Sequence, residues 1–501
     1  MNLLLAPTFG WGQQPITFDV VRLNPLNSFL APKSVQAIPG GYLTFATAGD
    51  GSGDVQDLHT IRFDSQGNYL GELAFRSSRL TEFGEFANVT DCATGGFAGA
   101  LSHFLGGQVI DSLFLYRFDD LGDTLWTTFL GSDTTAYARK CIEAVNGDLL
   151  VVGVFGGTYD AAYILRTNAD GELISFVQPD VPRFWALGVA EAANSDLIVC
   201  GRGNSATQNN NNNANILRCT AEGEVIWRRA ETRLSAFNQV IPTADGGVLA
   251  IGSYSPLLQW NPVDWNGPAT AFLVKYNANG SEAWRRDIIA ADNGTRECTL
   301  LDGFLDAEGD LITCGFIRNF SLGLNDKGML HKIDPEGNVI WSRFYSHYAG
   351  LPLGNPQIFR DVEPTSDGGF ILTGETWGIT PPNPVRLWLV KLDSLGCLVP
   401  GCNTVGVSEF VTDLVSALSI APNPSSTNLT YTLPLPADHR AAGSVQAVLL
   451  DAQGREVLRK TTPSNSTIQG QLDVSALHSG IYYLHLRDDQ KWLAGAKVVV
   501  E

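Results

Sequence analysis

Short runs of alternating apolar and polar residues fill most of the first 400 positions, and glycine-containing turns separate them. Alternation with a period of two residues is typical of half-buried β-strands. No long amphipathic helical stretch stands out, so the pattern predicts an all-β protein. The runs that open at a turn are GGYLTFATAG (from Gly40), GGFAGALS (Gly95), NGDLLVVG (Asn146), NSDLIVCG (Asn194), DGGVLAIG (Asp245), EGDLITCG (Glu308) and DGGFILTG (Asp367).

A second run follows each of the first and ends at a glycine. These glycines lie 49 to 59 residues apart. Each fits the left-handed position of a hairpin turn, and the Asp or Asn found three residues earlier in most copies can accept hydrogen bonds from the turn backbone. We interpret them as structural residues. They are Gly67, Gly122, Gly171, Gly223, Gly280, Gly337 and Gly396.

A repeat of about 55 residues with four strands has the length of one β-propeller blade plus its loops. Seven copies therefore predict a seven-bladed β-propeller over residues 13–403. The seventh copy lacks its fourth strand, because the loop CLVPGC follows Gly396, while ITFDVVRL (16–23) has no partner. We predict that this N-terminal strand closes the ring beside residues 387–393.

A tryptophan stands four residues after the turn glycine in four copies. A repeated Trp in one register is more often packing between blades than a ligand contact. We therefore interpret these residues as structural. They are Trp126, Trp227, Trp284 and Trp341.

The turn chemistry separates two faces of the ring. The tight turns must lie at one end of the blades, so the long irregular loops collect at the other, where we expect a ligand. The 18-residue connection 253–270 carries two tryptophans, which either bind a ligand or pack over blade five. The candidate ligand-binding residues are Trp260, Asp264, Trp265, Trp377, Arg202, Arg318 and Tyr159.

After a linker-like segment, 404–413, the chain changes character. The elements PNP, LLDAQGRE and LDVSALHSGIYYLHL follow in order, and the chain ends in AKVVVE. Their alternation predicts a small β-sandwich over residues 414–501.

This order of elements resembles the type A sorting domain of proteins exported by the type IX secretion system of certain Gram-negative bacteria. The resemblance implies an immunoglobulin-like sandwich that is recognised by the outer-membrane export machinery, and a protein that is secreted or held at the outer cell surface. More loosely, the seven repeats resemble secreted propellers joined to such a tail. The residues that match the sorting motif are Pro422, Asn423, Asp451, Gly454, Arg455, Asp473, Leu477, Gly480 and Tyr482.

The charge and the hydropathy of the chain limit the classes of partner that it can have. The net charge of −19 comes with no basic stripe, which argues against nucleic acid. No apolar run reaches 18 residues, so the sequence predicts no membrane-spanning helix. Residues 1–12 fit either the remnant of a leader or a disordered start.

The chain has eight cysteines, and disulfides in an oxidising compartment are favoured over metal binding. Cys397 and Cys402 form the best pair. Cys298 with Cys314, and Cys200 with Cys219, could pair across neighbouring strands, with buried thiols as the alternative.

No hydrolase, zinc-protease or nucleotide-binding motif is present. The only cofactor we consider is Ca²⁺, because Asp50, Asp54 and Asp57 place carboxylates on a Gly-rich loop. We favour a binding or adhesion module for a glycan or protein over catalysis, because loop aromatics outnumber any convergent catalytic set. A polysaccharide-active enzyme with carboxylates in the channel, and a purely structural surface protein, are the alternatives.

Overall fold

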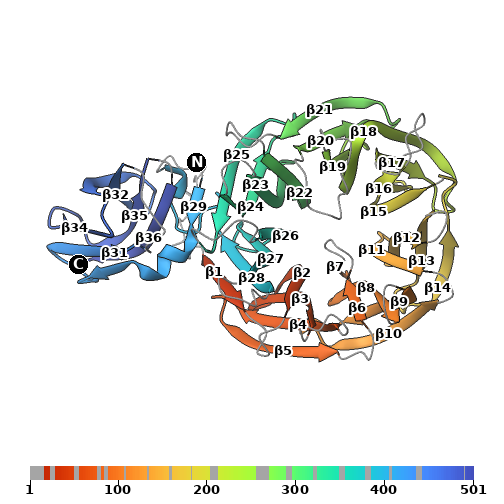
Figure 1. Cartoon of the computed structure of the whole chain (residues 1–501), viewed down its shortest axis with the longest axis horizontal. Coiled ribbons are helices and arrows are strands. Elements are labelled where there is room, and N and C mark those ends of the chain that lie inside the picture. The colour runs from red at the N-terminus through yellow and green to blue at the C-terminus, as the bar shows by residue number, and fades with distance from the viewer. Residues whose placement is uncertain are drawn as a thin grey trace, which may run out of the picture.

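The computed structural model is a ring of seven β-sheets with a smaller β-sandwich attached at one side (Figure 1). It describes residues 16–501 except 23–28, 50–55, 76–79, 84–88, 106–108, 132–134, 157–160, 182, 204–212, 255–269, 289–295, 320–323, 349–355, 378–384, 405–408, 436–442 and 490.

Within each blade the strands are antiparallel and run from the centre of the ring outward (Figure 1). Blades one to three contain β2 (Leu30–Ile38), β3 (Gly41–Gly49), β4 (Gln56–Asp64) and β5 (Tyr69–Phe75); β6 (Leu80–Phe83), β7 (Val89–Asp91), β8 (Phe97–Leu105), β9 (Val109–Phe118) and β10 (Thr124–Gly131); and β11 (Thr135–Glu143), β12 (Leu149–Gly156), β13 (Ala161–Thr167) and β14 (Leu173–Val177). In blade two, β6 and β7 both pair with β8 and share the innermost position.

Blades four and five share β18 (Val225–Pro242), which ends one sheet and begins the next. The other strands of blades four to six are β15 (Phe184–Glu191), β16 (Leu197–Gly203) and β17 (Asn213–Cys219); β19 (Val248–Tyr254), β20 (Thr270–Tyr276) and β21 (Glu282–Ile288); and β22 (Arg296–Leu305), β23 (Leu311–Asn319), β24 (Leu324–Ile333) and β25 (Val339–Ser346).

Blade seven is closed by the N-terminal strand. It contains β26 (Gln357–Pro364), β27 (Phe370–Trp377), β28 (Val385–Leu392) and β1 (Phe18–Arg22). β1 pairs with β28 from Phe18 opposite Lys391 to Arg22 opposite Leu387. Asp19 fixes this register, because its carboxylate accepts hydrogen bonds from the Trp388 indole at 2.6 Å and from His347 at 3.0 Å. The predicted seven-fold ring and its closure are both confirmed.

The repeat glycines take the predicted backbone conformation, with φ between 70° and 88° at all seven positions. In the first turn, Asp64 accepts hydrogen bonds from the amides of Gln66 and Asn68, both at 2.8 Å. The absence of a side chain also leaves room for the tryptophan of the preceding blade. A Cβ on Gly280 would lie 2.6 Å from the Trp227 ring, and the same contact joins Gly337 with Trp284. The prediction that these tryptophans pack between blades is therefore confirmed.

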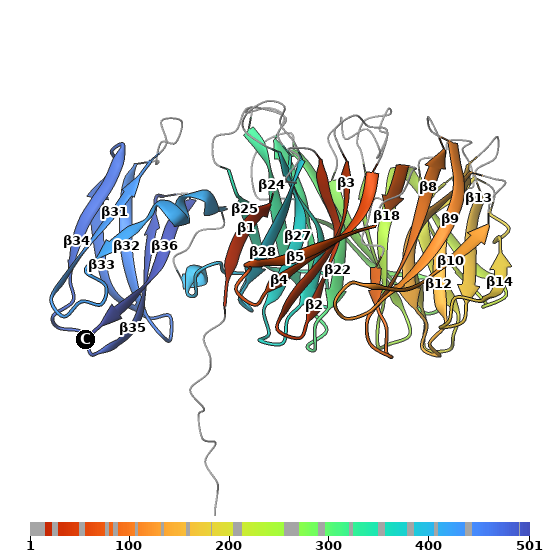
Figure 2. The same cartoon turned by 90° about the horizontal axis from the view of Figure 1, so that it is seen from below.

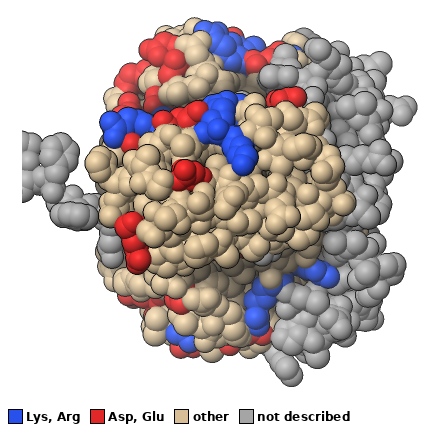
Figure 3. Space-filling model, turned by 90° about the vertical axis from the view of Figure 1, so that its left-hand side faces the viewer, with Lys and Arg blue, Asp and Glu red and all other residues tan. Residues whose placement is uncertain are grey.

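The C-terminal unit is a sandwich of two sheets with a separate apolar core (Figure 2). One sheet contains β30 (Ser419–Ala421), β31 (Asn428–Pro434) and β34 (Thr467–Asp473). The other contains β32 (Ser444–Asp451), β33 (Glu456–Pro463), β35 (Gly480–Arg487) and β36 (Lys491–Val500). The face turned away from the propeller is mostly uncharged (Figure 3).

The segment 404–413, expected as a simple linker, contains structure that joins the two units. The 3₁₀ turn η1 (Cys402–Thr404) precedes β29 (Glu409–Val411), and the short 3₁₀ helix η2 (Thr412–Ala417) follows it. β29 pairs in parallel with both β25 and β36, so blade six and one sheet of the sandwich form a continuous sheet. The two units are also joined by packing, since one apolar cluster contains residues of both. Within the described part of the chain, no helix has the length and apolar character needed to cross a membrane.

Candidate functional site

The innermost strands of six blades carry a one-residue β-bulge at the same place. A bulge inserts an unpaired residue and re-aims the neighbouring side chains, often beside a functional site. Because the blades are arranged around one axis, these bulges form a ring about the channel. The register shifts lie between Pro32 and Ser34, Ala138 and Lys140, Ala186 and Gly188, Phe237 and Gln239, Leu300 and Asp302, and Phe359 and Asp361.

Polar residues that follow the bulges interact with one another. The Gln239 amide donates a hydrogen bond to Asp302 at 2.9 Å, and Lys140 lies 3.8 Å from the same carboxylate oxygen. Asp361 accepts hydrogen bonds from the Ser34 hydroxyl at 2.8 Å and from the amide of the next residue at 2.7 Å. Lys140 and Asp302 belong to blades three and six, which are not neighbours, so their ion pair crosses the channel.

A cavity of about 470 Å³ lies at the tight-turn end of the channel. Every blade contributes to its wall, which combines carboxylates, amides and one ammonium group with aliphatic side chains. One lining residue from each blade, in order, gives Gln36, Asp91, Lys140, Glu191, Gln239, Phe304 and Glu363. A cavity of this volume is within the range of small-molecule sites.

The carboxyl groups around the cavity are held in unequal states. Burial, followed by the negative charges of Asp302 and Asp91, raises the pKa of Glu363 to about 8. Burial and the same Asp302 charge raise the pKa of Asp361 well above its usual range. The pKa of Asp91 is raised as well, by burial and by two neighbouring carboxylates. At neutral pH Glu363 is therefore a protonated carboxyl group that can donate a hydrogen bond.

Two other carboxylates of the wall also join neighbouring blades. Glu143 accepts a hydrogen bond from the amide of Ala93 at 2.6 Å, in the turn of blade two. Glu191 accepts one from the amide of Val145 at 2.6 Å, in the turn of blade three. These contacts hold the wall in place.

Three of the sequence-based ligand candidates are described, and they lie toward the ends of their blades opposite the tight turns. Trp260, Asp264, Trp265 and Tyr159 lie outside the described residues. Arg202, Arg318 and Trp377 are near the ends of the second strands of blades four, six and seven.

Two of these three residues make contacts that bear on their role. The Arg202 guanidinium stacks on Trp185 at 4.2 Å from the ring centroid. Arg318 forms a two-pronged ion pair with buried Asp326, at 2.7 and 2.6 Å, so this aspartate has a structural partner.

The candidate Ca²⁺ loop is described only at its end. Asp50 and Asp54 lie outside the described residues, and Asp57 stands in β4 opposite Ala48. Among the residues that the structure describes, no three His, Cys, Asp or Glu side chains are grouped to hold a metal ion.

The channel residues were not predicted from the sequence, because the repeat pattern is clearest in the strands after each tight turn, whereas these residues lie on the strand before it. A usable signal exists there, since Gln36, Glu143, Glu191 and Glu363 all stand one to three residues before a turn segment.

The cysteines form one disulfide, Cys397–Cys402, and the other six are buried thiols. The two cross-strand pairs do not form because of register. Cys200 stands opposite Ile216, and Cys298 stands opposite Ile317.

The residues of the sorting motif support turns and strand ends of the sandwich. Asp451 accepts hydrogen bonds from the amides of Gln453 and Arg455, both at 2.9 Å, around Gly454 with φ of 76°. Asn423 bridges to the last strand, through Lys497 and Val499, at 2.9 and 2.8 Å. Tyr482 donates a hydrogen bond to the carbonyl of His478 at 2.8 Å, Asp473 accepts one from the amide of Ser475 at 3.0 Å, and Leu477 packs against the sandwich core.

Residues 419–501 match the family described as secretion system C-terminal sorting domain. This unit is a sorting domain. The protein is therefore a propeller exported by type IX secretion to the cell surface or the extracellular space, and its sorting domain interacts with the secretion machinery.

Comparison with curated proteins finds no match to the chain. Solved structures that resemble it include a protein of unknown function from Bacteroides caccae, at 13% identity and a TM-score of 0.37, covering 63% of this chain and 94% of the other. The β-propeller domain of the Trilobed protease from Pyrococcus furiosus has 10% identity and a TM-score of 0.40, covering 72% and 93%. An α-L-arabinanase from Penicillium chrysogenum has 10% identity and a TM-score of 0.39, covering 75% and 98%.

Proposed function

We propose that the propeller is an extracellular binding module that holds a saccharide unit in the cavity at the tight-turn end of its channel. The observation that carries this proposal is a 470 Å³ cavity whose wall is built by all seven blades. Sugars present hydroxyl groups at their edges and C–H groups on their faces, so they need both donors and acceptors beside apolar surface. The amides, carboxyls and aliphatic side chains of this wall supply each of these.

The charge of the wall narrows the class of saccharide. Glu363 and Asp91 have raised pKa values because burial and neighbouring negative charges disfavour their ionised forms. A further anion would meet the same repulsion, so the cavity suits neutral or amine-bearing sugars over uronic acids and sulfated sugars.

The long-loop end of the channel is the second proposed contact surface, for a longer glycan or a protein. Its support is the stacked pair of Arg202 and Trp185, since guanidinium and indole groups are common anchors of binding surfaces. Trp260 and Trp265 of the long connection belong to the same proposal.

The test uses the full-length chain on a saccharide array, followed by calorimetry on the best ligand. Glu363→Leu removes a hydrogen-bonding group from the wall, and we expect at least a tenfold loss of affinity. Glu222→Leu changes an exposed glutamate in the outer turn of blade four and should leave the affinity unchanged. Equal affinity in the wild type and Glu363→Leu would rule out this cavity as the site.

Hydrolysis of a glycan is a second candidate, favoured by one observation. A carboxyl with a pKa of about 8 stays protonated at neutral pH, as a general acid must, and other carboxyl groups line the same cavity. Glu363→Gln distinguishes the two functions, because its amide can still donate a hydrogen bond but cannot transfer a proton. A pure binding module keeps its affinity and shows no turnover in either form, whereas a hydrolase loses turnover.

A further inference from the structure

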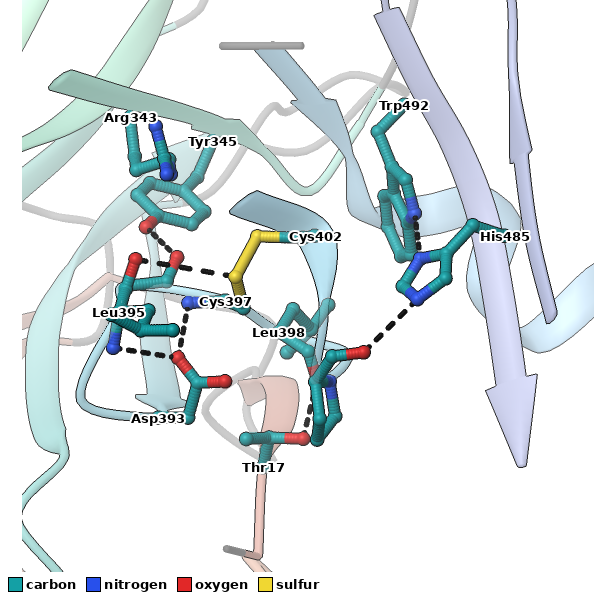
Figure 4. The surroundings of a disulfide bond; sticks show 12 residues. Thr17, Arg343, Tyr345, Asp393, Leu395, Cys397, Leu398, Cys402, His485 and Trp492 are labelled. Atoms are coloured by element: carbon teal, nitrogen blue, oxygen red, sulfur yellow. Dashed lines mark hydrogen bonds between the residues drawn. A yellow bond between two sulfur atoms is a disulfide. The ribbon is translucent and has the colours of Figure 1, made fainter. Parts of the chain in front are cut away.

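The loop closed by the Cys397–Cys402 disulfide lies where the propeller and the sorting domain meet (Figure 4). Blades six and seven hold it from one side. The Asp393 carboxylate accepts a hydrogen bond from the amide of Cys397 at 2.7 Å. The buried Tyr345 hydroxyl, from β25, donates to the carbonyl of Gly396 at 2.6 Å. The disulfide and these contacts fix the shape of the loop.

Two carbonyls of this loop, two residues apart, face different parts of the chain. The hydroxyl of Thr17, directly before β1, donates a hydrogen bond to the carbonyl of Leu398. His485 of the sorting domain donates from Nε2 to the carbonyl of Pro400 at 3.0 Å. The Trp492 indole donates to Nδ1 of the same histidine at 2.9 Å, which places the imidazole proton on Nε2. Figure 4 shows this chain of contacts from Thr17 to Trp492.

Apolar packing follows the same route. Leu398 and Val399 of the loop are buried in one cluster with Tyr345 of blade six and with Tyr483 and Trp492 of the sorting domain. Trp492 is fully buried. The loop is therefore part of an apolar cluster that continues from the propeller into the sorting domain, beside the sandwich's own core.

We infer that firm docking of the sorting domain depends on a closed propeller ring. One disulfide-held loop thus binds the N-terminal segment through one carbonyl and the sorting domain through another. If the N-terminal strand or the disulfide is removed, the loop changes shape and no longer fits against His485 and Trp492. The first described residues of the chain thereby influence its last strand. This coupling is independent of any ligand in the channel.

Hydrogen exchange of the full-length protein tests the coupling, with the amides of β36 as the readout and those of β12, in blade three, as the internal reference. Thr17→Val removes one hydrogen-bond donor at constant shape, and we expect β36 to exchange about fivefold faster. Replacing both loop cysteines by serine should accelerate it at least tenfold. In both variants, β12 should exchange as in the wild type.

Thr127→Val is the matched control, because Thr127 is exposed on β10 and far along the chain from the loop. It should leave β36 unchanged. Unchanged exchange of β36 in Thr17→Val would overturn the inference, as would equal acceleration of β36 and β12, which would indicate general loss of stability. If the serine variant fails to fold, Thr17→Val decides the question alone.

Discussion

Trp227→Ala provides the sharpest test of how the ring is held together. Trp227 lies on β18 in blade four, is 8% exposed, and packs beneath the turn of blade five. Its indole also donates a hydrogen bond to the carbonyl of Ala278 at 3.0 Å. The substitution removes both of these contacts between the two blades.

The magnitude follows from these two contacts. A tryptophan buries about 150–250 Å² of surface, which at about 25 cal/mol per Å² is worth about 4–6 kcal/mol. Measured Trp→Ala substitutions in cores cost about 3–5 kcal/mol, and a hydrogen bond adds about 1 kcal/mol. We therefore expect a loss of about 4 kcal/mol. With an unfolding entropy of about 2 cal/mol/K per residue over about 400 residues, this lowers the Tm by about 5 °C.

Differential scanning calorimetry on the full-length chain measures this shift. The neighbouring Ile226→Ala is the control, because Ile226 is 51% exposed and its truncation should move the Tm by less than 1 °C. Trp227→Phe should fall between the two, since it keeps most of the apolar contact and loses the hydrogen bond. If Trp227→Ala and Ile226→Ala have the same Tm, packing between blades does not contribute the stability that we assign to it.

Three further predictions concern the turns, the channel and the thiols. Gly280→Ala should lower the Tm more than Gly368→Ala. Both glycines have φ of 78°, so the backbone strain is the same, but a Cβ at Gly280 would lie 2.6 Å from Trp227, whereas a Cβ at Gly368 would meet nothing within 4 Å. Burial raises the pKa of Glu363 from an ordinary 4.5 to about 8, so the stability that this carboxyl adds is present below pH 4.5 and is lost as the pH rises through 8. Glu363→Gln should therefore flatten the pH dependence of the urea midpoint between these values. A pH profile that is unchanged in the variant would contradict this prediction. The six cysteines outside the disulfide are buried, so a thiol reagent should label them only after denaturation. Labelling of the native protein, read by mass spectrometry, would show that the core opens.

The architecture of this protein could be predicted from its sequence because the signals involved are local. A glycine at a left-handed turn position is required by the backbone of that turn alone, and seven such positions repeat at the spacing of a blade. The strand 16–23 without a partner, and the seventh repeat without a last strand, were enough to predict ring closure. The sorting domain was recognisable for the same reason, since Asp451 and Gly454 belong to one short turn.

The channel site and the docking of the sorting domain were decided by tertiary structure. Lys140 and Asp302 stand 162 positions apart, and only the closed ring and the bulge before each residue bring them to 3.8 Å. Likewise, Thr17 and His485 meet the same loop from opposite ends of the chain. Sequence periodicity records which face of a strand is buried, but the distance between charges on different blades depends on how many blades close the ring. The packing that joins the two units could not be predicted for the same reason, because the surfaces that meet come from segments that no local pattern links.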